Sequence, residues 1–255
     1  MAREMLVVAA RGCDWEYGCG GTVLRERAAG GEARVIIVTN DMHAVPGKAP
    51  DETAELRRAE CEAAAKAAGV DIQFLDLRTR WYWKGDEKVA LDWRVYDEDE
   101  LARLPGEGSI HTLLGGGAWR AVLDTMTDLR PDAVFTHPVS DIDQASLYAA
   151  HSVYYAVSAL EDRELASSMR IYMWQSEAGR GLTALETDVL VDITSVREKK
   201  CELVACHASQ ADDGRLEAAR LREGHWGTAV SPKRTDTGRF AEAFTLSRHK
   251  AEGLL

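Results

Sequence analysis

The stretch from Leu6 to Asn40 limits what this chain can fold into more than any other part of the sequence. It consists, in order, of an apolar strand (6–10), a polar turn (11–17), a glycine-rich entry (18–21), a helix (22–29) and a second apolar strand (34–39). Two apolar strands joined by a helix that opens with glycines are typical of a βαβ unit with parallel strands. Because ligands in open α/β sheets bind beyond the carboxyl ends of the strands, the polar turn is the expected position of a functional site.

Four polar residues crowd this turn, and the glycines after it do not predict a dinucleotide site. The candidate residues of the turn are Arg11, Cys13, Asp14 and Glu16. The glycines at positions 18, 20 and 21 lack the G-x-G-x-x-G spacing, and only Asp41 follows the second strand where a ribose-binding acid would stand. We therefore do not expect a nicotinamide cofactor.

The same turn carries a family resemblance. Its sequence, ARGCDWEYGCGG, resembles the signature A-H-P-D-D-E-x-x-G-C-G-G of the LmbE/PIG-L family, whose members remove acyl groups from amino sugars with a zinc ion. Gly18–Gly21 and Asp14 match that signature. Arg11, however, stands where the family has a zinc-binding histidine, and Cys13 stands where it has the aspartate taken to be the general base.

Later segments extend the resemblance over nearly the whole chain. Residues 57–70 are similar to the family pattern R-x-x-E-x-x-x-A-A-x-x-L-G-V, in which the arginine matching Arg57 shapes the substrate pocket. The alternative is that Arg57 and Glu60 form a structural pair on one helix. Thr79 stands close to where the family has an aspartate that touches sugar hydroxyls. The segments HASQ (207–210) and AEAF (241–244) also resemble family signatures.

A second departure follows the strand at 132–137, whose sequence DAVFTH resembles the family's P-D-x-V-x-T-H. The family then carries D-Y-H-P-D-H, whereas this chain carries DIDQAS at 141–146. By this resemblance Asp143 replaces the histidine of oxyanion stabilisation, Ala145 replaces an aspartate, and Ser146 replaces a zinc-binding histidine. The motifs that specify the fold are kept, and those that specify catalysis are replaced.

The fold prediction is a single Rossmann-like α/β domain over residues 1–255, with a mostly parallel sheet flanked by helices. Further strands are predicted at 70–77, 132–137, 170–174 and 188–194, and further helices at 51–68, 117–129, 149–157 and 196–210. Gly69 is the predicted C-cap of the helix at 51–68. Residues 80–116 are predicted to form a Trp-rich loop or lid in which Trp81 and Trp83 contact a ligand, or else a satellite core or oligomer contact.

Composition excludes several partners. A net charge of −11 argues against nucleic acid and anionic membranes, because phosphate groups are bound by clustered Lys and Arg. The apolar run near the N-terminus is too short for a signal peptide, and no segment is apolar enough to span a membrane, so we expect a cytoplasmic protein. The five cysteines include no C-x-x-C pair, which predicts reduced thiols. A small-molecule substrate is the expected partner, and a homo-oligomer stays open.

A catalytic zinc site needs about three protein ligands, and of the family's three only Asp14 is kept. Arg11 adds a permanent positive charge where the dication would lie, so we predict an Arg11–Asp14 ion pair in place of the metal and no cofactor. Two alternatives use a divalent cation such as zinc. One would hold it with Asp14, Asp141 and Asp143, and the other with Cys13, Asp14 and His137.

The replaced site still offers catalytic groups. Cys13 is a candidate nucleophile, because Arg11 and a helix N-terminus favour its thiolate, with His137 or His151 as the base. The alternative is an inert thiol. Asp14, Asp141 and Asp143 are the other predicted catalytic residues, since paired carboxylates suit proton transfer or the binding of an amine. The predicted substrate-binding residues are Arg11, Glu16, Arg57, Trp81, Trp83, His137 and His207.

These residues favour an enzyme that acts without catalytic zinc on a small polar metabolite with an amine or amide group. The reaction would be hydrolysis, acyl transfer or acid-base rearrangement. One alternative is a metal-dependent N-deacetylase of an acetamido sugar with a relocated metal site. Another is a non-catalytic binding or partner subunit.

Overall fold

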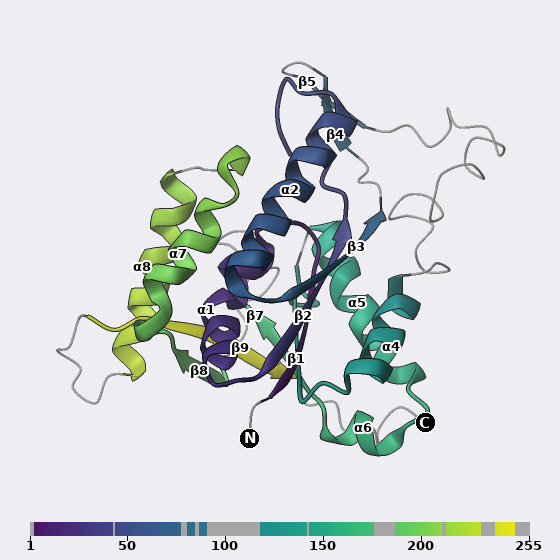
Figure 1. Cartoon of the computed structure of the whole chain (residues 1–255), viewed down its shortest axis with the longest axis vertical. Helices are drawn as coiled ribbons and strands as arrows, with labels where there is room; N and C mark the ends of the chain where they lie inside the picture. The colour runs from purple at the N-terminus through teal and green to yellow at the C-terminus, as the bar shows by residue number, and fades with distance from the viewer. Residues whose placement is uncertain are drawn as a thin grey trace.

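The protein is built on a seven-stranded sheet with the strand order β3-β2-β1-β6-β7-β9-β8 (Figure 1). The computed structural model describes residues 3–42, 44–77, 81–84, 87–90, 118–141, 143–175, 187–210, 213–230 and 238–247. The strands of the sheet are β1 (Glu4–Ala9), β2 (Glu32–Thr39), β3 (Asp71–Leu77), β6 (Ala133–Thr136), β7 (Arg170–Trp174), β8 (Val189–Asp192) and β9 (Ala241–Ser247). The five strands from β3 to β7 in this order are parallel, and β9 is antiparallel to both of its neighbours. The predicted mostly parallel sheet is confirmed.

Strand β1 is an interior strand of the sheet, and its side chains are apolar on both faces. Residues 5–9 are all at most 1% exposed, as expected for a parallel strand covered by helices on both sides. On one side of β1, Val7 is aligned with Val35 of β2, and on the other side it is aligned with Phe135 of β6. The strand order therefore reverses at β1 and β6, whose carboxyl ends flank the expected ligand crevice.

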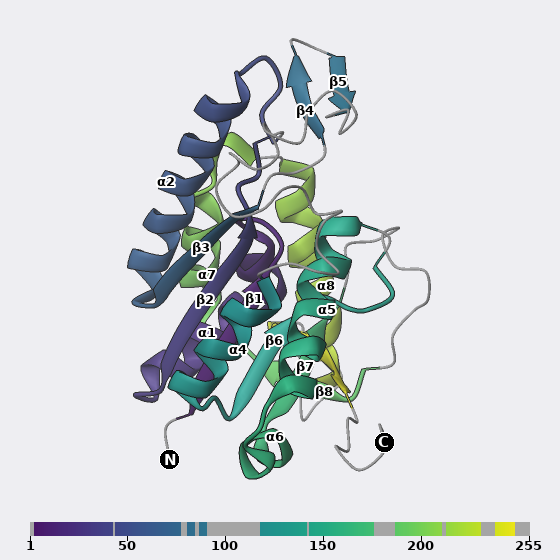
Figure 2. The same cartoon turned by 90° about the vertical axis from the view of Figure 1, so that its right-hand side faces the viewer.

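Helices cover both faces of the sheet (Figure 2). Helices α4 (Ala118–Leu129) and α5 (Gln144–Ala159) pack on one face, where Leu6, Val8 and Ile36 point. Helices α1 (Asp14–Ala28), α2 (Pro50–Ala68) and α7 (Arg197–Ala205) pack on the other, where Val7 and Val35 point. Within the described residues, the further helices are α6 (Arg163–Ser168), α8 (Asp213–Val230) and the short 3₁₀ segments η2 (Thr194–Val196) and η3 (Ala208–Gln210). Within the described part of the chain, every helix is too short or too polar to cross a lipid bilayer.

Helix α1 begins at Asp14, so the prediction that it begins at Thr22 is wrong. The glycines lie inside the helix because neighbouring elements approach it closely. A Cβ atom on Gly21 would lie 2.7 Å from the side chain of Ile193, a distance that no side chain tolerates. The prediction for Gly69 is confirmed, since it caps α2 with a left-handed φ of 69°.

Other element boundaries also differ from the prediction. Helix α5 begins at Gln144, five residues before the expected 149–157 segment, because Asp143 supplies an N-cap for it. Helix α8 and the full length of β9 carry no clear periodicity signal and were not predicted.

A buried carboxylate anchors α1 to the antiparallel edge of the sheet. Glu242 of β9 accepts hydrogen bonds from the backbone N–H groups of Gly21 and Thr22, both at 2.8 Å, and from the Thr22 hydroxyl at 2.6 Å. The ammonium group of Lys200 lies 2.6 Å from Glu242 and 2.7 Å from Glu223. Burial lowers the pKa of Lys200, but the two glutamates outweigh it and the pKa is raised. The AEAF segment is therefore part of the scaffold.

The predicted lid coincides with a small hairpin and with residues outside the described part of the chain. Strand β4 (Trp81–Lys84) pairs antiparallel with β5 (Glu87–Ala90), beyond the carboxyl end of β3 in Figure 1. Thr79, Trp93, Tyr96 and the side chains of Trp81 and Trp83 lie outside the described residues. The lid and its ligand contacts stay a prediction.

We expect Glu242→Gln to lower the free energy of unfolding by about 3–5 kcal/mol, because it removes one partner of a buried ion pair and places an amide donor against backbone donors. Urea unfolding monitored by circular dichroism measures the change. Glu198→Gln is the control, since the Glu198 side chain is 94% exposed and its loss should cost no more than about 0.5 kcal/mol. Equal midpoints for wild type and Glu242→Gln would show that the carboxylate does not anchor α1.

Candidate active site

The candidate site lies beyond the carboxyl ends of three neighbouring parallel strands. Arg11 follows β1, Asp41 follows β2 and His137 follows β6. Parallel strands bring these ends to one edge of the sheet, so residues far apart in the sequence meet there. This is the edge predicted from the polar turn at 11–17.

The turn after β1 directs its side chains through an unusual backbone. Cys13 has a φ of 71°, the left-handed region that non-glycine residues rarely adopt, and it forms the N-cap position of α1. The turn closes when Asp14 Oδ2 accepts the backbone N–H of Arg11 at 2.8 Å. Cys13 is only 3% exposed, and none of the five cysteines forms a disulfide.

Arg11 forms its ion pair with Asp143, so the predicted Arg11–Asp14 ion pair is wrong. Arg11 Nη2 donates to both carboxylate oxygens of Asp143 at 2.8 Å. The Asp14 carboxylate is turned back toward the backbone N–H of Arg11, whereas the guanidinium reaches Asp143 at the start of α5. Burial lowers the pKa of Arg11, but the carboxylates of Asp143, Asp14 and Asp41 outweigh it and the pKa is raised. The guanidinium is therefore permanently charged.

Asp143 also caps helix α5. Its Oδ1 atom accepts the backbone N–H groups of Ala145 at 3.1 Å and Ser146 at 3.0 Å. Its own N–H donates to Asp141 Oδ1 at 2.9 Å, which holds the two aspartates together. A negative charge at a helix N-terminus is stabilised by the helix dipole. Both aspartates therefore contribute to local structure as well as to the charge of the site.

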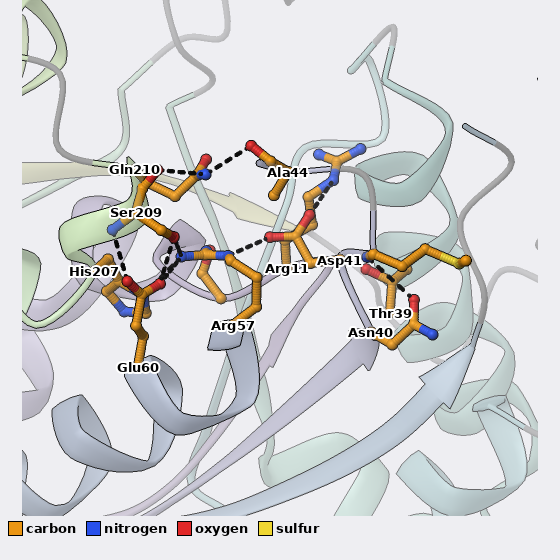
Figure 3. Close-up of polar contacts among 12 residues, drawn as sticks. Arg11, Thr39, Asn40, Asp41, Ala44, Arg57, Glu60, His207, Ser209 and Gln210 are labelled. Carbon is orange, nitrogen blue, oxygen red and sulfur yellow. Dashed lines mark hydrogen bonds and ion pairs between the residues drawn. The ribbon is translucent and has the colours of Figure 1, made fainter. Parts of the chain in front are cut away.

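Asp41 connects the guanidinium groups of Arg11 and Arg57 (Figure 3). Its Oδ2 accepts from Arg57 Nε at 2.8 Å, and its Oδ1 lies 3.7 Å from Arg11 Nε. Arg57 is 1% exposed and also donates to the Gly12 carbonyl at 2.8 Å and to Glu60 Oε2 at 2.5 Å. Burial lowers the pKa of Arg57, but Asp41 and other neighbours outweigh it and the pKa is raised. Arg57 and Glu60 thus form a buried pair.

The HASQ segment completes this buried network. Glu60 accepts the Ser209 backbone N–H at 2.6 Å and the Ser209 hydroxyl at 2.7 Å. Gln210 donates from Nε2 to the Ala44 carbonyl at 2.9 Å, which ties the segment to the loop after β2. The segment therefore fixes the position of the Arg57–Glu60 pair (Figure 3).

Contacts of His207 define its protonation pattern. Arg57 Nη1 lies 3.3 Å from His207 Nδ1, and because arginine only donates, Nδ1 accepts. Nε2 then carries the proton and donates to Glu16 Oε1 at 2.7 Å. Glu16 is fully buried, and its Oε2 atom has no hydrogen-bond partner in the described part of the structure. Glu16 and His207 belong to the interior, below the residues that face the crevice.

His137 has two competing neighbours. Its Nε2 atom accepts the backbone N–H of Ala10 at 3.0 Å and lies 3.4 Å from Asp14 Oδ2. One nitrogen cannot accept from Ala10 and donate to Asp14 at the same time. The neutral ring therefore carries its proton on Nδ1, and only a protonated ring would pair with Asp14. The ring also packs edge-on against Trp174, with centroids 4.6 Å apart.

Most of the predicted site residues meet at this edge, with an excess of acidic groups. The carboxyl groups are Asp14, Asp41, Asp141, Asp143, Glu16 and Glu60, and the guanidinium groups are Arg11 and Arg57. His151, the other candidate base, packs against Tyr155 on α5. Sequence reasoning did not assign a role in the site to Asp41, although its position directly after β2 was a usable signal.

The residues in place of the family's zinc ligands do not fit a zinc ion. The described residues contain no group of three or more His, Cys, Asp or Glu side chains arranged to hold a metal. Arg11 places its positive charge between Asp143 and Asp41, where a dication would be repelled. Asp14 alone is a weak site, because a catalytic zinc needs about three protein ligands.

Comparisons with known proteins agree with this fold. The sequence matches the family PIG-L, described as GlcNAc-PI de-N-acetylase, over residues 6–159. No curated protein matches the chain at a significant level. Among solved structures, GalB, the 4-carboxy-2-hydroxymuconate hydratase of Pseudomonas putida, is 17% identical with a TM-score of 0.68, and the match covers 100% of both chains.

Two solved structures of deacetylases are also similar to this chain in fold. N,N'-diacetylchitobiose deacetylase from Pyrococcus horikoshii is 18% identical with a TM-score of 0.68, over 96% of this chain and 84% of that one. The A40926 pseudoaglycone deacetylase is 16% identical with a TM-score of 0.65, over 99% of this chain and 100% of that one. At such identities the likeness establishes the shared fold.

The contacts of Asp14 predict a specific pH dependence of stability. Burial raises the pKa of Asp14, but His137 and Arg11 outweigh it, so the pKa lies below the ordinary value of 3.8. The stabilisation is therefore present above pH 3.8 and is lost as the pH falls through the lower folded-state pKa. We expect wild type to lose stability relative to Asp14→Asn in that acidic range, as measured by urea midpoints between about pH 2 and pH 7. A constant difference across the range would contradict this assignment.

Proposed function

The chain belongs to the PIG-L family, described as GlcNAc-PI de-N-acetylase, and from that membership we propose a hydrolase-like enzyme that acts without catalytic zinc. Its substrate is a small polar metabolite that carries an amine or amide group. The observation that carries this proposal is the ion pair between Arg11 Nη2 and Asp143 Oδ2, which lie 2.8 Å apart. By the resemblance, Arg11 stands in place of a zinc-binding histidine and Asp143 in place of the histidine of oxyanion stabilisation.

Arg11 supports the proposal because it supplies a fixed positive charge. Its Nη2 atom is held by Asp143, whereas Nη1 makes no hydrogen bond to any residue that the structure describes. A fixed cation with an unused donor suits the negative charge that develops on a carbonyl oxygen during amide hydrolysis. Binding of zinc in place of this guanidinium would break the ion pair between Arg11 and Asp143, whose side chains are only 16% and 27% exposed.

Asp14 supports the binding of an amine or the activation of water. Its lowered pKa keeps the carboxylate ionised at neutral pH. Oδ2 receives both of the contacts from Arg11 and His137, so Oδ1 is the oxygen that remains for a substrate. The excess of carboxyl groups over guanidinium groups at this edge attracts a cationic amine.

Cys13 is the alternative reactive group. Its thiol lies at the N-terminus of α1, where the helix dipole favours a thiolate. We propose Cys13 as a nucleophile only for an acyl-transfer version of the reaction, in which an acyl group would be held on sulfur before hydrolysis. Cys13→Ser would then retain substrate binding and lose turnover.

Zinc binding tests the replacement of the metal. We expect purified wild-type protein to take up no zinc in calorimetric titration, because Arg11 repels it. The double variant Arg11→His/Ser146→His restores both histidines of the family's metal site beside Asp14. It should bind about one zinc ion per chain. Circular dichroism melting curves check that the variant folds. One tightly bound zinc ion per wild-type chain would overturn the proposal that the enzyme acts without zinc. Acetamido sugars would then become the first substrates to test.

Activity tests the role of Arg11. Acetate release from a panel of N-acetylated amines and amino sugars would be measured with and without a chelator. Activity should resist the chelator, and Arg11→Gln should lower kcat by about 10²–10³-fold, as for the loss of an oxyanion contact. Arg58→Gln is the matched control, because the Arg58 side chain is 41% exposed. Chelator-sensitive activity, or full activity in Arg11→Gln, would contradict the proposal.

A further inference from the structure

Two buried polar atoms face each other in the site without touching. Arg11 Nε and Asp41 Oδ1 are 3.7 Å apart, beyond hydrogen-bond distance, and neither atom has a hydrogen-bond partner among the described residues. Buried polar atoms are nearly always paired, because an unpaired one loses its interactions with water and gains nothing. Arg11 Nε and Asp41 Oδ1 attract each other as a long ion pair, but a buried donor and a buried acceptor that both lack a hydrogen bond within the described part of the chain still need an explanation.

The gap is held open from both sides. The other oxygen of Asp41 accepts from Arg57 Nε at 2.8 Å, and Arg57 is itself bound by Glu60 and the Gly12 carbonyl. Arg11 is drawn the other way by its two hydrogen bonds to Asp143. Figure 3 shows the Asp41 carboxylate between the two guanidinium groups. In this arrangement the other hydrogen bonds of both residues are made with other partners, and Nε and Oδ1 stay 3.7 Å apart.

The Asp41 backbone also points to a functional constraint. Its φ is 53°, in the left-handed region, and its side chain is 4% exposed. Backbone strain of this kind at a non-glycine residue persists where surrounding contacts hold it, and such positions cluster at functional sites. Here the left-handed conformation places the carboxylate between the two arginines.

The hydrogen-bonding requirements of Arg11 Nε and Asp41 Oδ1 select the kind of group that can bind to both atoms. The occupant must accept from Arg11 Nε–H and donate to Asp41 Oδ1. An ammonium group cannot accept, and a carbonyl or carboxylate cannot donate. A water molecule or a hydroxyl group does both through one oxygen atom, whereas an aliphatic amine is protonated at neutral pH and only donates. A metal cation would be repelled by the positive charge of Arg11.

We infer that Arg11 Nε and Asp41 Oδ1 form a hydroxyl-binding site, which holds either the hydrolytic water or a hydroxyl of the substrate. The inference rests on the proposed function and adds Asp41 to its machinery. With water in the site, Asp41 Oδ1 takes one proton while the water oxygen bonds to the acyl carbon. The C–N bond then breaks, and the departing amine takes that proton.

A crystal structure of the wild-type protein tests the site directly. We expect one ordered oxygen within hydrogen-bond distance of both Arg11 Nε and Asp41 Oδ1. In Asp41→Asn the amide oxygen is retained by Arg57, so the amide nitrogen faces the gap and a donor replaces the acceptor. The ordered oxygen should then be lost. A hydrogen bond directly between Nε and Oδ1 in wild type, with no ordered oxygen beside them that bonds to both, would overturn the inference.

Asp76→Asn is the matched control. Asp76 also has a φ of 53° and pairs with the next arginine of α2, at 2.5 Å from Arg58 Nη2, but its side chain is 51% exposed. The ordered oxygen should be present in this variant. Its loss in Asp76→Asn as well as in Asp41→Asn would show that general perturbation, rather than the site, removes it.

Two further measurements identify the source of the hydroxyl. Wild-type crystals soaked in glucosamine would either retain the ordered water or show a sugar hydroxyl in its place. With a substrate from the acetate-release panel, Asp41→Asn should lower kcat by about 10²-fold or more if the site holds hydrolytic water. It should raise KM at unchanged kcat if the site holds a substrate hydroxyl. Unchanged kcat and KM would overturn the inference.

Failure of this inference can be told apart from failure of the proposed function. Exclusion of zinc depends on Arg11 and Asp143, and Asp41→Asn leaves both in place. If wild type excludes zinc while Asp41→Asn is fully active, only the hydroxyl site is wrong. If wild type binds zinc tightly, the proposed function is wrong whatever Asp41 does.

Discussion

The ion pair between Arg11 and Asp143 is the interaction on which the site depends. It joins the end of β1 to the start of α5, across the point where the strand order of the sheet reverses. The two side chains are only 16% and 27% exposed, so each charge needs the other. Asp143 also caps α5, which ties the position of the guanidinium to the position of a whole helix. A metal ion could be gained or lost, but this cation is part of the fold.

A second buried layer determines where that cation points. Arg57 is held by Asp41, Glu60 and the Gly12 carbonyl, and Ser209 holds Glu60 in turn. This layer lies between α2 and the HASQ segment and satisfies nearly all of its polar atoms internally (Figure 3). Two buried atoms beside this layer, Arg11 Nε and Asp41 Oδ1, lack a hydrogen bond to any described residue although their neighbours are held by several. In this chain, which shares the fold of the deacetylases, the positive charges at this edge of the sheet are the guanidinium groups of Arg11 and Arg57.

Sequence reasoning located the site and part of its composition, but not its pairing. It placed Arg11 and Asp14 at the carboxyl end of β1, and the structure agrees. It paired these two residues with each other, whereas the Asp14 carboxylate turns back to the Arg11 backbone and the guanidinium reaches α5. It gave Asp41 no role in the site, since nothing in the local sequence shows that β2 ends beside Arg57. Pairing of side chains from different elements depends on distances that spacing in the chain does not encode.

The sequence by itself determined the alternation of strands and helices, the parallel sheet and the edge at which the candidate site lies, because apolar periodicity and glycine positions act over short distances. It also determined that Arg11 stands where a zinc ligand is expected. Only the tertiary structure decided which carboxylate neutralises that arginine, where α1 begins, and that Asp41 faces two guanidinium groups. Those outcomes follow from the packing of α1, α2 and α5 around one sheet edge. In that interior every buried charge must find a partner from whichever element lies within reach.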